Sequence, residues 1–437
     1  MTSTPNIPKG PLNGIRIIDF TWKAVGPWSS RMLTPYGAEV IHIEPPHEPD
    51  DHRWDIRPAV GRNFDIQAKH NDHLFGNGAD YYSAPYYSQL HNGKLSASLN
   101  ARNPKGKELL EELIKKSDAV VENFSARVLG NWGLSWERLH ELNPKLVYLS
   151  TSGFGHEGSL SHYRTYGPIV QAESGLTFTS GLPEREPAGW GYSHMDIAGG
   201  WIGGLGLIMA LMQARKTGVG THVDYAVTEG AMTLLGPYFL DYHANGRPTR
   251  RPGFPPGNHS EWPPVAPHNT YRCAGIDRQG QDWWVFIACE TQEQFEAFAN
   301  EIGKPELLSD PKFGTMAARK QNEAELDEII STWTAPRRRY EIQDRLQAVG
   351  VIAVAVQGPE DRVDYDPQLR HREVYPVIQN PEVGEYEIEA FVPKLSRTPP
   401  DNSLRATAVR ENEQYVYGYL LGLSESEMAA LRSEGVI

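Results

Sequence analysis

One carboxylate stands alone in a long apolar stretch of the sequence. Residues 191–220 read GYSHMDIAGGWIGGLGLIMALMQARKTGVG, and Asp196 is the only acidic residue among them. As a helix N-cap, Asp196 would accept hydrogen bonds from the first free N–H groups of the helix. As a nucleophile, it would already be ionised at neutral pH, because the ordinary pKa of aspartate is about 3.9, and the helix N-terminus would hold it in place. The residue types alone leave both interpretations open.

Other familiar chemical motifs are missing from the sequence. The glycines at 199–206 lie in an apolar helix and lack the preceding strand and following acid of a dinucleotide site. No P-loop, H-E-x-x-H pair or G-x-S-x-G elbow occurs. The histidines are scattered, and Cys273 and Cys289 form neither a disulfide framework nor a zinc pattern. We expect no metal and no NAD, and we interpret the glycines as a surface for close packing against a ligand or a second subunit.

Composition narrows the class of protein. A chain of 437 residues is longer than one hydrophobic core usually supports, so two domains are expected. The net charge of −13 argues against nucleic acid or an anionic membrane as the main partner, but it is compatible with an anionic small molecule bound in a basic pocket. The start of the chain has no apolar signal region, and the apolar run 201–212 is too short to span a bilayer. We expect a soluble cytoplasmic protein.

The elements that would position Asp196 follow a strand and helix alternation. Residues 103–118 have leucines at helical spacing, and 201–215 are apolar nearly all round, which predicts a buried helix. This alternation of strands and helices predicts an α/β fold. Residues 1–230 are expected to form a large domain with a doubly wound, Rossmann-like parallel sheet, and the C-terminal segment 405–437 is expected to pack on that domain. Residues 231–404 are expected to form linkers and a smaller α+β domain. The predicted strands of the large domain are 14–20, 38–44, 94–100, 119–124, 145–154 and 221–227.

A series of sequence blocks resembles one known family. The blocks are residues 11–46, NGKLSASLN at 92–100, 103–124, 142–155, MDIAGG at 195–200 and KTGVGTHVD at 216–224. In this order they resemble the family III CoA-transferases, the CaiB/BaiF group that includes formyl-CoA transferase and carnitine CoA-transferase. Asn100 stands where the family usually has Asp. The resemblance covers most of residues 10–235 and implies an interlocked homodimer.

The resemblance also implies a reaction. In the family, the aspartate that matches Asp196 attacks the thioester of a donor acyl-CoA and forms a mixed anhydride. CoA thiolate then converts the anhydride into an aspartyl-CoA thioester, and an acceptor carboxylate completes the exchange without ATP. Coenzyme A is therefore the implied co-substrate. Succinyl-CoA or acetyl-CoA is the implied donor, and the tryptophans and tyrosines in expected pocket loops indicate an aromatic or dicarboxylic acceptor.

Further site residues follow from matching positions. The turn at Lys23, Ala24 and Val25 is expected to approach CoA, and Asn123 and Phe124 are expected to contact it, although Phe124 also suits a plain core position. Trp54 lies near a family position that covers the substrate, and Tyr166 either lines the site or packs. Two departures from formyl-CoA transferase affect phosphate and substrate binding: Pro45 replaces an arginine and Ala24 replaces a glutamine. The candidates for the CoA phosphates, each also interpretable as an ordinary surface charge, are Arg53, Lys94 and Arg127.

Three other functions compete with this prediction. An α-methylacyl-CoA racemase has the same fold and aspartate, but it needs a second proton-transfer group, and Tyr166 stands at the position of its histidine. A partner subunit of a heteromer is disfavoured because such chains lack the aspartate. An NAD oxidoreductase is disfavoured because the dinucleotide fingerprint is missing.

Overall fold

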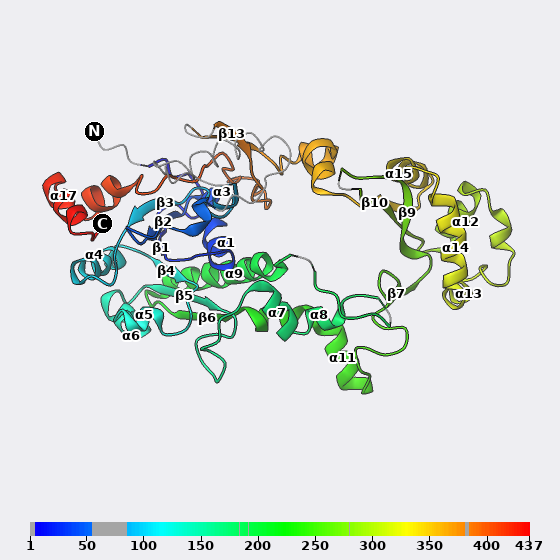
Figure 1. The fold of residues 1–437 in the computed structure, drawn as a ribbon, viewed down its shortest axis with the longest axis horizontal. Coiled ribbons are helices and arrows are strands. Elements are labelled where there is room, and N and C mark those ends of the chain that lie inside the picture. Colours follow the sequence, from blue (N-terminus) through cyan, green and yellow to red (C-terminus); the bar gives the residue numbers. More distant parts are fainter. Residues whose placement is uncertain (1–4, 55–84, 183, 191, 279, 381–383) are drawn as a thin grey trace. The chain divides into compact units, whose positions relative to one another are not determined.

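A six-stranded parallel sheet organises the larger part of the chain (Figure 1). The computed structural model describes residues 5–54, 85–182, 184–190, 192–278, 280–380 and 384–437. The chain divides into two compact units, the larger formed by residues 1–177, 189–240 and 367–437, and the smaller by 178–188 and 241–366. The strands of the large sheet are β1 (Arg16–Asp19), β2 (Glu39–Glu44), β3 (Leu95–Ser98), β4 (Ala119–Glu122), β5 (Val147–Ser152) and β6 (His222–Ala226).

The strand order is β3-β2-β1-β4-β5-β6, and every neighbouring pair is parallel. Ile18 pairs with Ile41 on one side and with Val120 on the other, which fixes the register of the three central strands. This order is that of a doubly wound Rossmann-type sheet, so the predicted fold class is confirmed.

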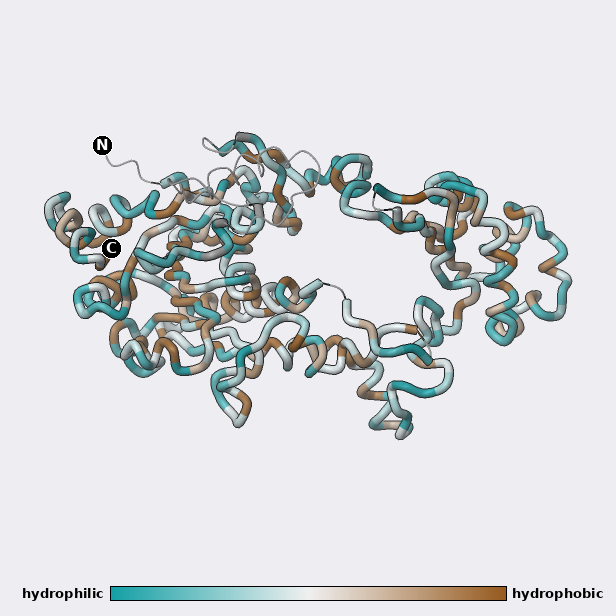
Figure 2. Tube along the Cα trace, in the orientation of Figure 1, coloured by the Kyte–Doolittle hydropathy of each residue, from teal (hydrophilic) through white to brown (hydrophobic). Residues whose placement is uncertain are grey.

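Helices cover both faces of this sheet because alternate strand residues point in opposite directions. Ile18 belongs to the core cluster that also contains Leu110 and Leu113, whereas Ile17 belongs to the opposite cluster with Leu207 and Leu211. Brown, hydrophobic stretches follow these strands in Figure 2. Helices of this unit are α1 (Val25–Arg31), α3 (Pro85–His91), α4 (Pro104–Lys115), α5 (Val128–Asn131), α6 (Trp136–Leu142), α7 (Gly167–Glu173), α9 (His194–Thr217), α10 (Val227–Met232), α16 (Pro367–His371) and α17 (Glu425–Ser433).

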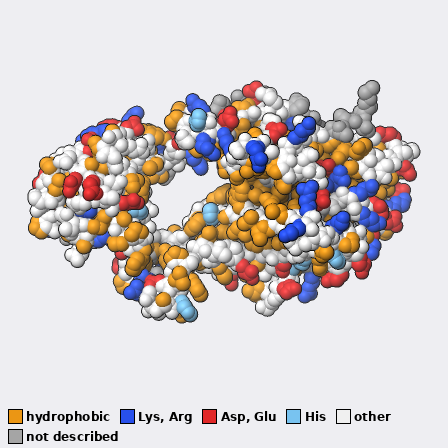
Figure 3. All heavy atoms as spheres, turned by 180° about the vertical axis from the view of Figure 1, so that it is seen from behind, with side chains coloured by type: hydrophobic (Ala, Val, Ile, Leu, Met, Phe, Trp, Pro, Cys, Tyr) orange, Lys and Arg blue, Asp and Glu red, His pale blue; other side chains and the backbone are white. Residues whose placement is uncertain are grey.

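Helix α9 is longer and less buried than the sequence predicts. It begins at His194, with Ser193 as its N-cap, and ends where Gly218 takes a left-handed φ of 76°. Its inner side packs on the sheet, but Leu205, Met209 and Met212 on its other side are more than half exposed. Figure 3 shows hydrophobic side chains at the surface of this unit. The expectation of a helix buried all round was therefore wrong, because only one side of α9 faces the core of its own chain.

Among the described helices, α9 alone has the length and apolar composition of a membrane span. The expectation that the apolar run is too short to span a bilayer considered residues 201–212 alone. It left out the first and last turns of α9. Leu207, Ala210 and Leu211 nevertheless pack against sheet residues. This packing is that of a core helix, and the fold gives no indication of a membrane protein.

The C-terminal part of the chain returns to the large unit earlier than residue 405. The return begins at residue 367 and includes a hairpin of β12 (Val377–Asn380) and β13 (Gly384–Glu387). Arg31 donates to the carbonyl of Glu389 at 2.6 Å, and Asp401 N–H donates to the carbonyl of Pro35 at 2.9 Å. These bonds attach the returning segment to α1 and the loop after it, where composition gave no boundary signal.

The smaller unit has its own antiparallel sheet and core. The sheet order is β11-β10-β9, and the core contains Phe295, Phe298, Val285 and Ile287. Its elements are β7 (Ser260–Glu261), β8 (Pro264–Val265), β9 (His268–Ile276), β10 (Asp282–Ala288), α12 (Gln292–Glu301), α13 (Met316–Gln321), α14 (Glu323–Thr334), α15 (Arg339–Ala348) and β11 (Ile352–Ala355). Two helices span the limits between the units, α8 (Leu176–Thr179) and α11 (Gly236–Asn245).

Candidate active site

A pocket of about 200 Å³ lies at the carboxyl ends of the central strands. Residues 23–25 follow β1, residues 123–125 follow β4, and residues 151–153 end β5, and all of them line it. The strand order reverses between β1 and β4, and open α/β sheets bind their ligands at this kind of switch point. Asp196 from the first turn of α9 lines the same pocket.

The loop after β1 is held rigidly by side chains at its base. Asp19 accepts hydrogen bonds from the Thr21 N–H at 2.7 Å and from the Ser30 hydroxyl at 2.7 Å. Asn123 accepts from the Trp22 N–H and donates to the Trp22 carbonyl, both at 2.7 Å. The side-chain amide of Asn123 therefore clamps this loop to the end of β4, a role that the sequence gave no signal for.

Glycines bring α9 close to α1 and α10 at this loop. A Cβ added at Gly200 would lie 2.6 Å from the Cβ of Trp28 in α1, and one at Gly199 would lie 2.9 Å from a methyl of Val227 in α10. Such distances are shorter than normal carbon contacts, so a larger residue at either position would force its neighbours to move. The prediction of close packing is confirmed, but the partners are helices of the same chain. This packing carries Asp196 to the mouth of the pocket.

Asp196 is the third residue of α9, not its N-cap. Its N–H donates to the Ser193 carbonyl at 2.9 Å, and Ser193 itself occupies the cap position. Burial raises the pKa of Asp196 to about 6, while a hydrogen bond with the Ser193 side chain acts in the opposite direction. The expectation of an ordinary pKa was therefore wrong, because the first turn of α9 is half-buried. The carboxylate remains mostly ionised at neutral pH but is poorly hydrated.

The structure brings most of the predicted site residues together. Seven of the eleven line the pocket, namely Lys23, Ala24, Val25, Asn123, Phe124, Tyr166 and Asp196. Phe124 is additionally fixed by its N–H, which donates to the Glu122 carboxyl group at 2.6 Å. Tyr166 is exposed and occupies the N-cap position of α7. The next residue, Gly167, lies close to Ser193, because a Cβ added at Gly167 would be 2.6 Å from the Ser193 Cβ.

Two predicted phosphate ligands lie inside the protein instead of in the pocket. Arg53 is fully buried and binds Glu44 through two hydrogen bonds of 2.8 and 2.7 Å. Lys94 is buried and pairs with Asp19 at 2.7 Å. Because a buried charge requires a partner of opposite sign, these cations serve internal ion pairs. We do not carry them into the proposed site.

The remaining two predictions lie beyond the pocket lining. Arg127 is exposed and is the N-cap of α5, with a left-handed φ of 75°. It lies two residues after Ser125, which lines the pocket. Trp54 is the last residue of the 3₁₀ helix η2 (Asp51–Trp54), and its side chain lies outside the described residues. Both stay predictions.

Sequence reasoning missed several residues of the pocket. Arg164, Thr151, Ser152 and Tyr163 line it, and Arg164 and Lys23 are the Lys and Arg side chains among the described lining residues. Arg164 is exposed and belongs to the loop after β5, which carries no recognisable motif. A cation in this loop could have been singled out only by knowing that β5 ends beside β4.

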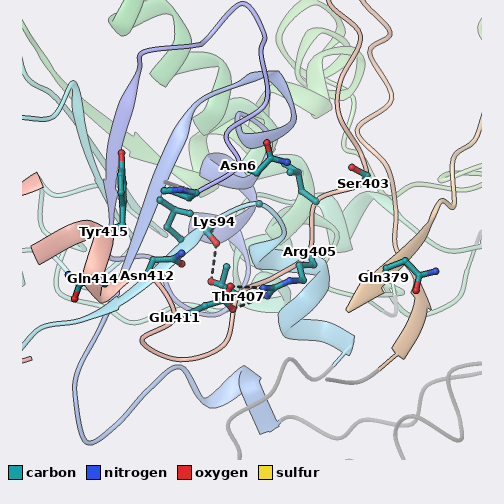
Figure 4. Close-up of a pocket in the computed structure, with 14 residues that line it drawn as sticks. Asn6, Lys94, Gln379, Ser403, Arg405, Thr407, Glu411, Asn412, Gln414 and Tyr415 are labelled. Atoms are coloured by element: carbon teal, nitrogen blue, oxygen red, sulfur yellow. Dashed lines mark hydrogen bonds and ion pairs between the residues drawn. The ribbon is translucent and has the colours of Figure 1, made fainter. Parts of the chain in front are cut away.

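A second cavity of about 600 Å³ lies at the other end of the sheet (Figure 4). Residues 93–95, where β3 begins, and residues 403–415 line it. Arg405 in this cavity is paired with Glu411 at 2.5 Å, and Thr407 donates to the Lys94 carbonyl at 3.0 Å, as Figure 4 shows. Arg405 and Glu411 are paired with each other and Lys94 is paired with the buried Asp19, so the smaller pocket with Asp196 is the candidate active site.

Comparison with known proteins agrees with this geometry. The sequence model of CoA-transferase family III matches residues 12–408. The succinyl-CoA–D-citramalate CoA-transferase of Chloroflexus aurantiacus is 30% identical over 431 residues, which cover 98% of this chain and 99% of that protein. The succinate–glutarate CoA-transferase of Agrobacterium fabrum is 32% identical, with 85% and 86% covered.

A solved structure shows the same fold. A CaiB/BaiF family protein from Brucella suis superposes with a TM-score of 0.79 and 27% identity, covering 94% of this chain and 100% of that one. The matches extend through both units, so they are not confined to the strand and helix alternation that many families share. The chain belongs to CoA-transferase family III.

Proposed function

We propose that this protein moves CoA from an acyl-CoA donor to an acceptor carboxylic acid through covalent intermediates on Asp196. The observation that carries the proposal is the position of Asp196, a half-buried carboxylate at the switch-point pocket of a family III fold. Poor hydration makes a carboxylate a better nucleophile, and the N-terminal end of α9 favours the negative charge that develops beside it.

The proposed reaction consists of four balanced exchanges. The Asp196 carboxylate attacks the donor thioester and forms an acyl-aspartyl anhydride, with CoA thiolate as the leaving group. The thiolate attacks the aspartyl carbonyl, which releases the donor acid as a carboxylate and leaves an aspartyl-CoA thioester. The acceptor carboxylate attacks this thioester and regenerates an anhydride and the thiolate. The thiolate then attacks the acceptor carbonyl, which gives the new acyl-CoA and restores Asp196.

The charges of the pocket suit anionic substrates. Lys23 and Arg164 line it together with Asp196, so the lining contains two cations of the kind that bind CoA phosphate groups or the second carboxylate of a dicarboxylic acid. The relatives are named for citramalate, succinate and glutarate, all dicarboxylic acids. We propose a succinyl-CoA-type donor and a dicarboxylic acceptor. The aromatic rings of Phe124, Tyr163 and Tyr166 in the lining support an aromatic acid as the second candidate.

Racemisation of a branched acyl-CoA is less well supported by the pocket. That reaction needs a second acid-base group across the α-carbon from Asp196. Among the described residues that line the pocket, none is a histidine, a glutamate or a cysteine. Lys23, Tyr163 and Tyr166 are the other lining side chains that can transfer a proton, so a racemase would have to use one of them.

We also propose that the protein works as a homodimer in the cytoplasm, with CoA as co-substrate. The half-exposed side of α9, with Leu205, Met209 and Met212, supports a partner copy there. The molecular mass in solution, measured by light scattering, tests this part separately from activity. A monomer at micromolar concentration would contradict it.

The test of the proposed function is a competition among acids. The enzyme is mixed with succinyl-CoA and a panel of dicarboxylic, aromatic and short monocarboxylic acids, and new thioesters are identified by mass spectrometry. We expect a dicarboxylic acid to give the fastest exchange. Epimerisation of a branched acyl-CoA with every acceptor acid omitted would instead identify a racemase.

The covalent step has its own test. Protein quenched during turnover is treated with hydroxylamine, digested and searched for a hydroxamate on Asp196. Asp196→Asn is the matched control, because it keeps the shape of the side chain and removes the nucleophile. An unmodified Asp196 during product formation, or substantial exchange by the variant, would refute the proposed mechanism.

A further inference from the structure

Three ionisable side chains from separate elements of the sequence, two histidines and one aspartate, lie close together inside the large unit. His42 lies in β2, Asp50 in the segment after it, and His91 at the end of α3. Their side chains are at most 1% exposed. The imidazole nitrogens and the carboxylate oxygen that face one another all lie within 4.8 Å. None of the three takes part in the proposed CoA transfer, and the sequence gave no indication that they meet.

The facing atoms have no hydrogen-bond partners in the part of the chain that the structure describes. Both ring nitrogens of His42, both of His91, and Oδ2 of Asp50 are buried there without one. Oδ2 of Asp50 lies 3.5 Å from Nε2 of His91 and 4.0 Å from Nε2 of His42, at or beyond the limit of a hydrogen bond. Burying a polar atom without a partner is costly, and one such atom from each of the three side chains faces the other two, an arrangement that favours a shared ligand.

Two buried cations near the cluster are bonded to carboxylates other than Asp50. Lys94 pairs with Asp19 at 2.7 Å, and Arg53 pairs with Glu44 through two hydrogen bonds. Oδ1 of Asp50 accepts the His52 N–H at 2.9 Å, and its Oδ2 has no hydrogen-bond partner among the described residues.

We propose that His42, Asp50 and His91 bind a divalent transition-metal ion, for which zinc is the best-matched example. Two imidazole nitrogens and a carboxylate oxygen are typical ligands of zinc and of neighbouring metals. Bonds of about 2.0–2.1 Å place tetrahedral ligand atoms roughly 3.3 Å apart, so the observed separations close by small side-chain movements. The ion would balance the charge of Asp50 and bind one nitrogen of each imidazole.

The structure assigns this ion a structural role. It would add a further link between β2, the segment after β2 and the end of α3, which Arg53 already joins through hydrogen bonds to Glu44 and to the Tyr87 hydroxyl. His42 also pairs in register with Asp19, the residue that anchors the loop after β1 at the active-site pocket. The stacked Tyr87 ring, 4.3 Å from that of His91, holds that imidazole in a fixed orientation. The ion would therefore stiffen the part of the sheet that supports the CoA pocket.

The test measures metal content in the full-length protein. The chain is produced without a histidine tag, loaded with Zn²⁺, exchanged into metal-free buffer and analysed by inductively coupled plasma mass spectrometry. We expect about one ion per chain for the wild type and a loss of at least tenfold in His42→Asn and His91→Gln. His259→Gln is the matched control, because His259 also faces a carboxylate but is hydrogen-bonded to Asp327 at 2.8 Å. The control should keep its metal.

A second measurement does not depend on the variants folding. X-ray absorption of the zinc-loaded wild type should show imidazole scattering and an N/O shell at about 2.0–2.1 Å. Wild-type protein without stoichiometric zinc, a zinc spectrum without imidazole, or folded cluster variants that keep their zinc would each overturn the proposal. All of these readouts are independent of CoA transfer.

Discussion

Replacing Asp196 by asparagine should stabilise the folded protein while abolishing CoA transfer. The reason is the pKa of Asp196, which burial raises to about 6 from the ordinary 3.8. The folded protein therefore binds this proton more tightly than the unfolded chain does. The stability contribution of the group is highest below pH 4, falls as the pH rises from about 4 to 6, and is constant above that range.

The size of this stability difference follows from the shift in the pKa of Asp196. A difference of roughly two pKa units corresponds to about 3 kcal/mol, at about 1.4 kcal/mol per unit. Part of the side chain reaches solvent, so the realised value should be about 1–3 kcal/mol. Asparagine does not ionise, so its contribution to stability does not change with pH. The free energy of unfolding of the variant should therefore rise by about 1–3 kcal/mol relative to that of the wild type between pH 4 and pH 8.

The assay is thermal unfolding of both proteins at several pH values. Because the chain has two units, the useful quantity is the change in the difference between the two Tm values, not a single free energy. We expect the variant to unfold at nearly the wild-type temperature at pH 4 and a few degrees higher at pH 8. Equal differences at both pH values would show that Asp196 is not held in a poorly hydrated site.

Three further predictions concern the pocket and its support. The value of kcat/KM should fall about tenfold per pH unit below about pH 6, because protonated Asp196 is not a nucleophile; a profile that stays flat down to pH 5 would contradict this. Lys23→Ala and Arg164→Ala should each raise a substrate KM roughly tenfold with little change in kcat, whereas Lys304→Ala, a control in the smaller unit, should not; equal KM values in all three would remove these cations from the binding site. Gly200→Ala should destabilise the protein by about 1–3 kcal/mol because its new methyl meets Trp28, whereas Gly203→Ala in the same helix meets ordinary contacts of 3.4 Å and should be tolerated; unfolding temperatures compare the two, and equal stability would show that α1 and α9 separate easily.

Local pattern was sufficient to predict the sheet and to single out Asp196 as a candidate. The β-branched runs around Ile17, Val40 and Val120 are buried strands because each residue reaches one of two covered faces. Asp196 stood out because an acidic residue is conspicuous beside an apolar run. Residues that directly follow strands, such as Lys23 and Asn123, were also predictable, since strand ends of a parallel sheet meet at one edge.

Electrostatic partners could not be predicted in the same way. Arg53 and Lys94 looked like surface cations, but tertiary folding buries each against one carboxylate, Glu44 or Asp19. Arg164 lies in a loop without a motif and reaches the pocket only because β5 ends beside β4. Whether a charge is paired or available depends on contacts between segments far apart in the chain.

The sequence by itself determined the order of strands and helices, the family, and Asp196 as the candidate carboxylate, because these depend on residues close together in the chain. Only the tertiary structure decided the hydration of Asp196, since its burial is produced by the packing of elements that are distant in the sequence. It also decided that His42, Asp50 and His91 face one another, because their meeting depends on β2 and α3 being adjacent in space. Desolvation and long-range proximity are properties of the fold, and no local pattern encodes them.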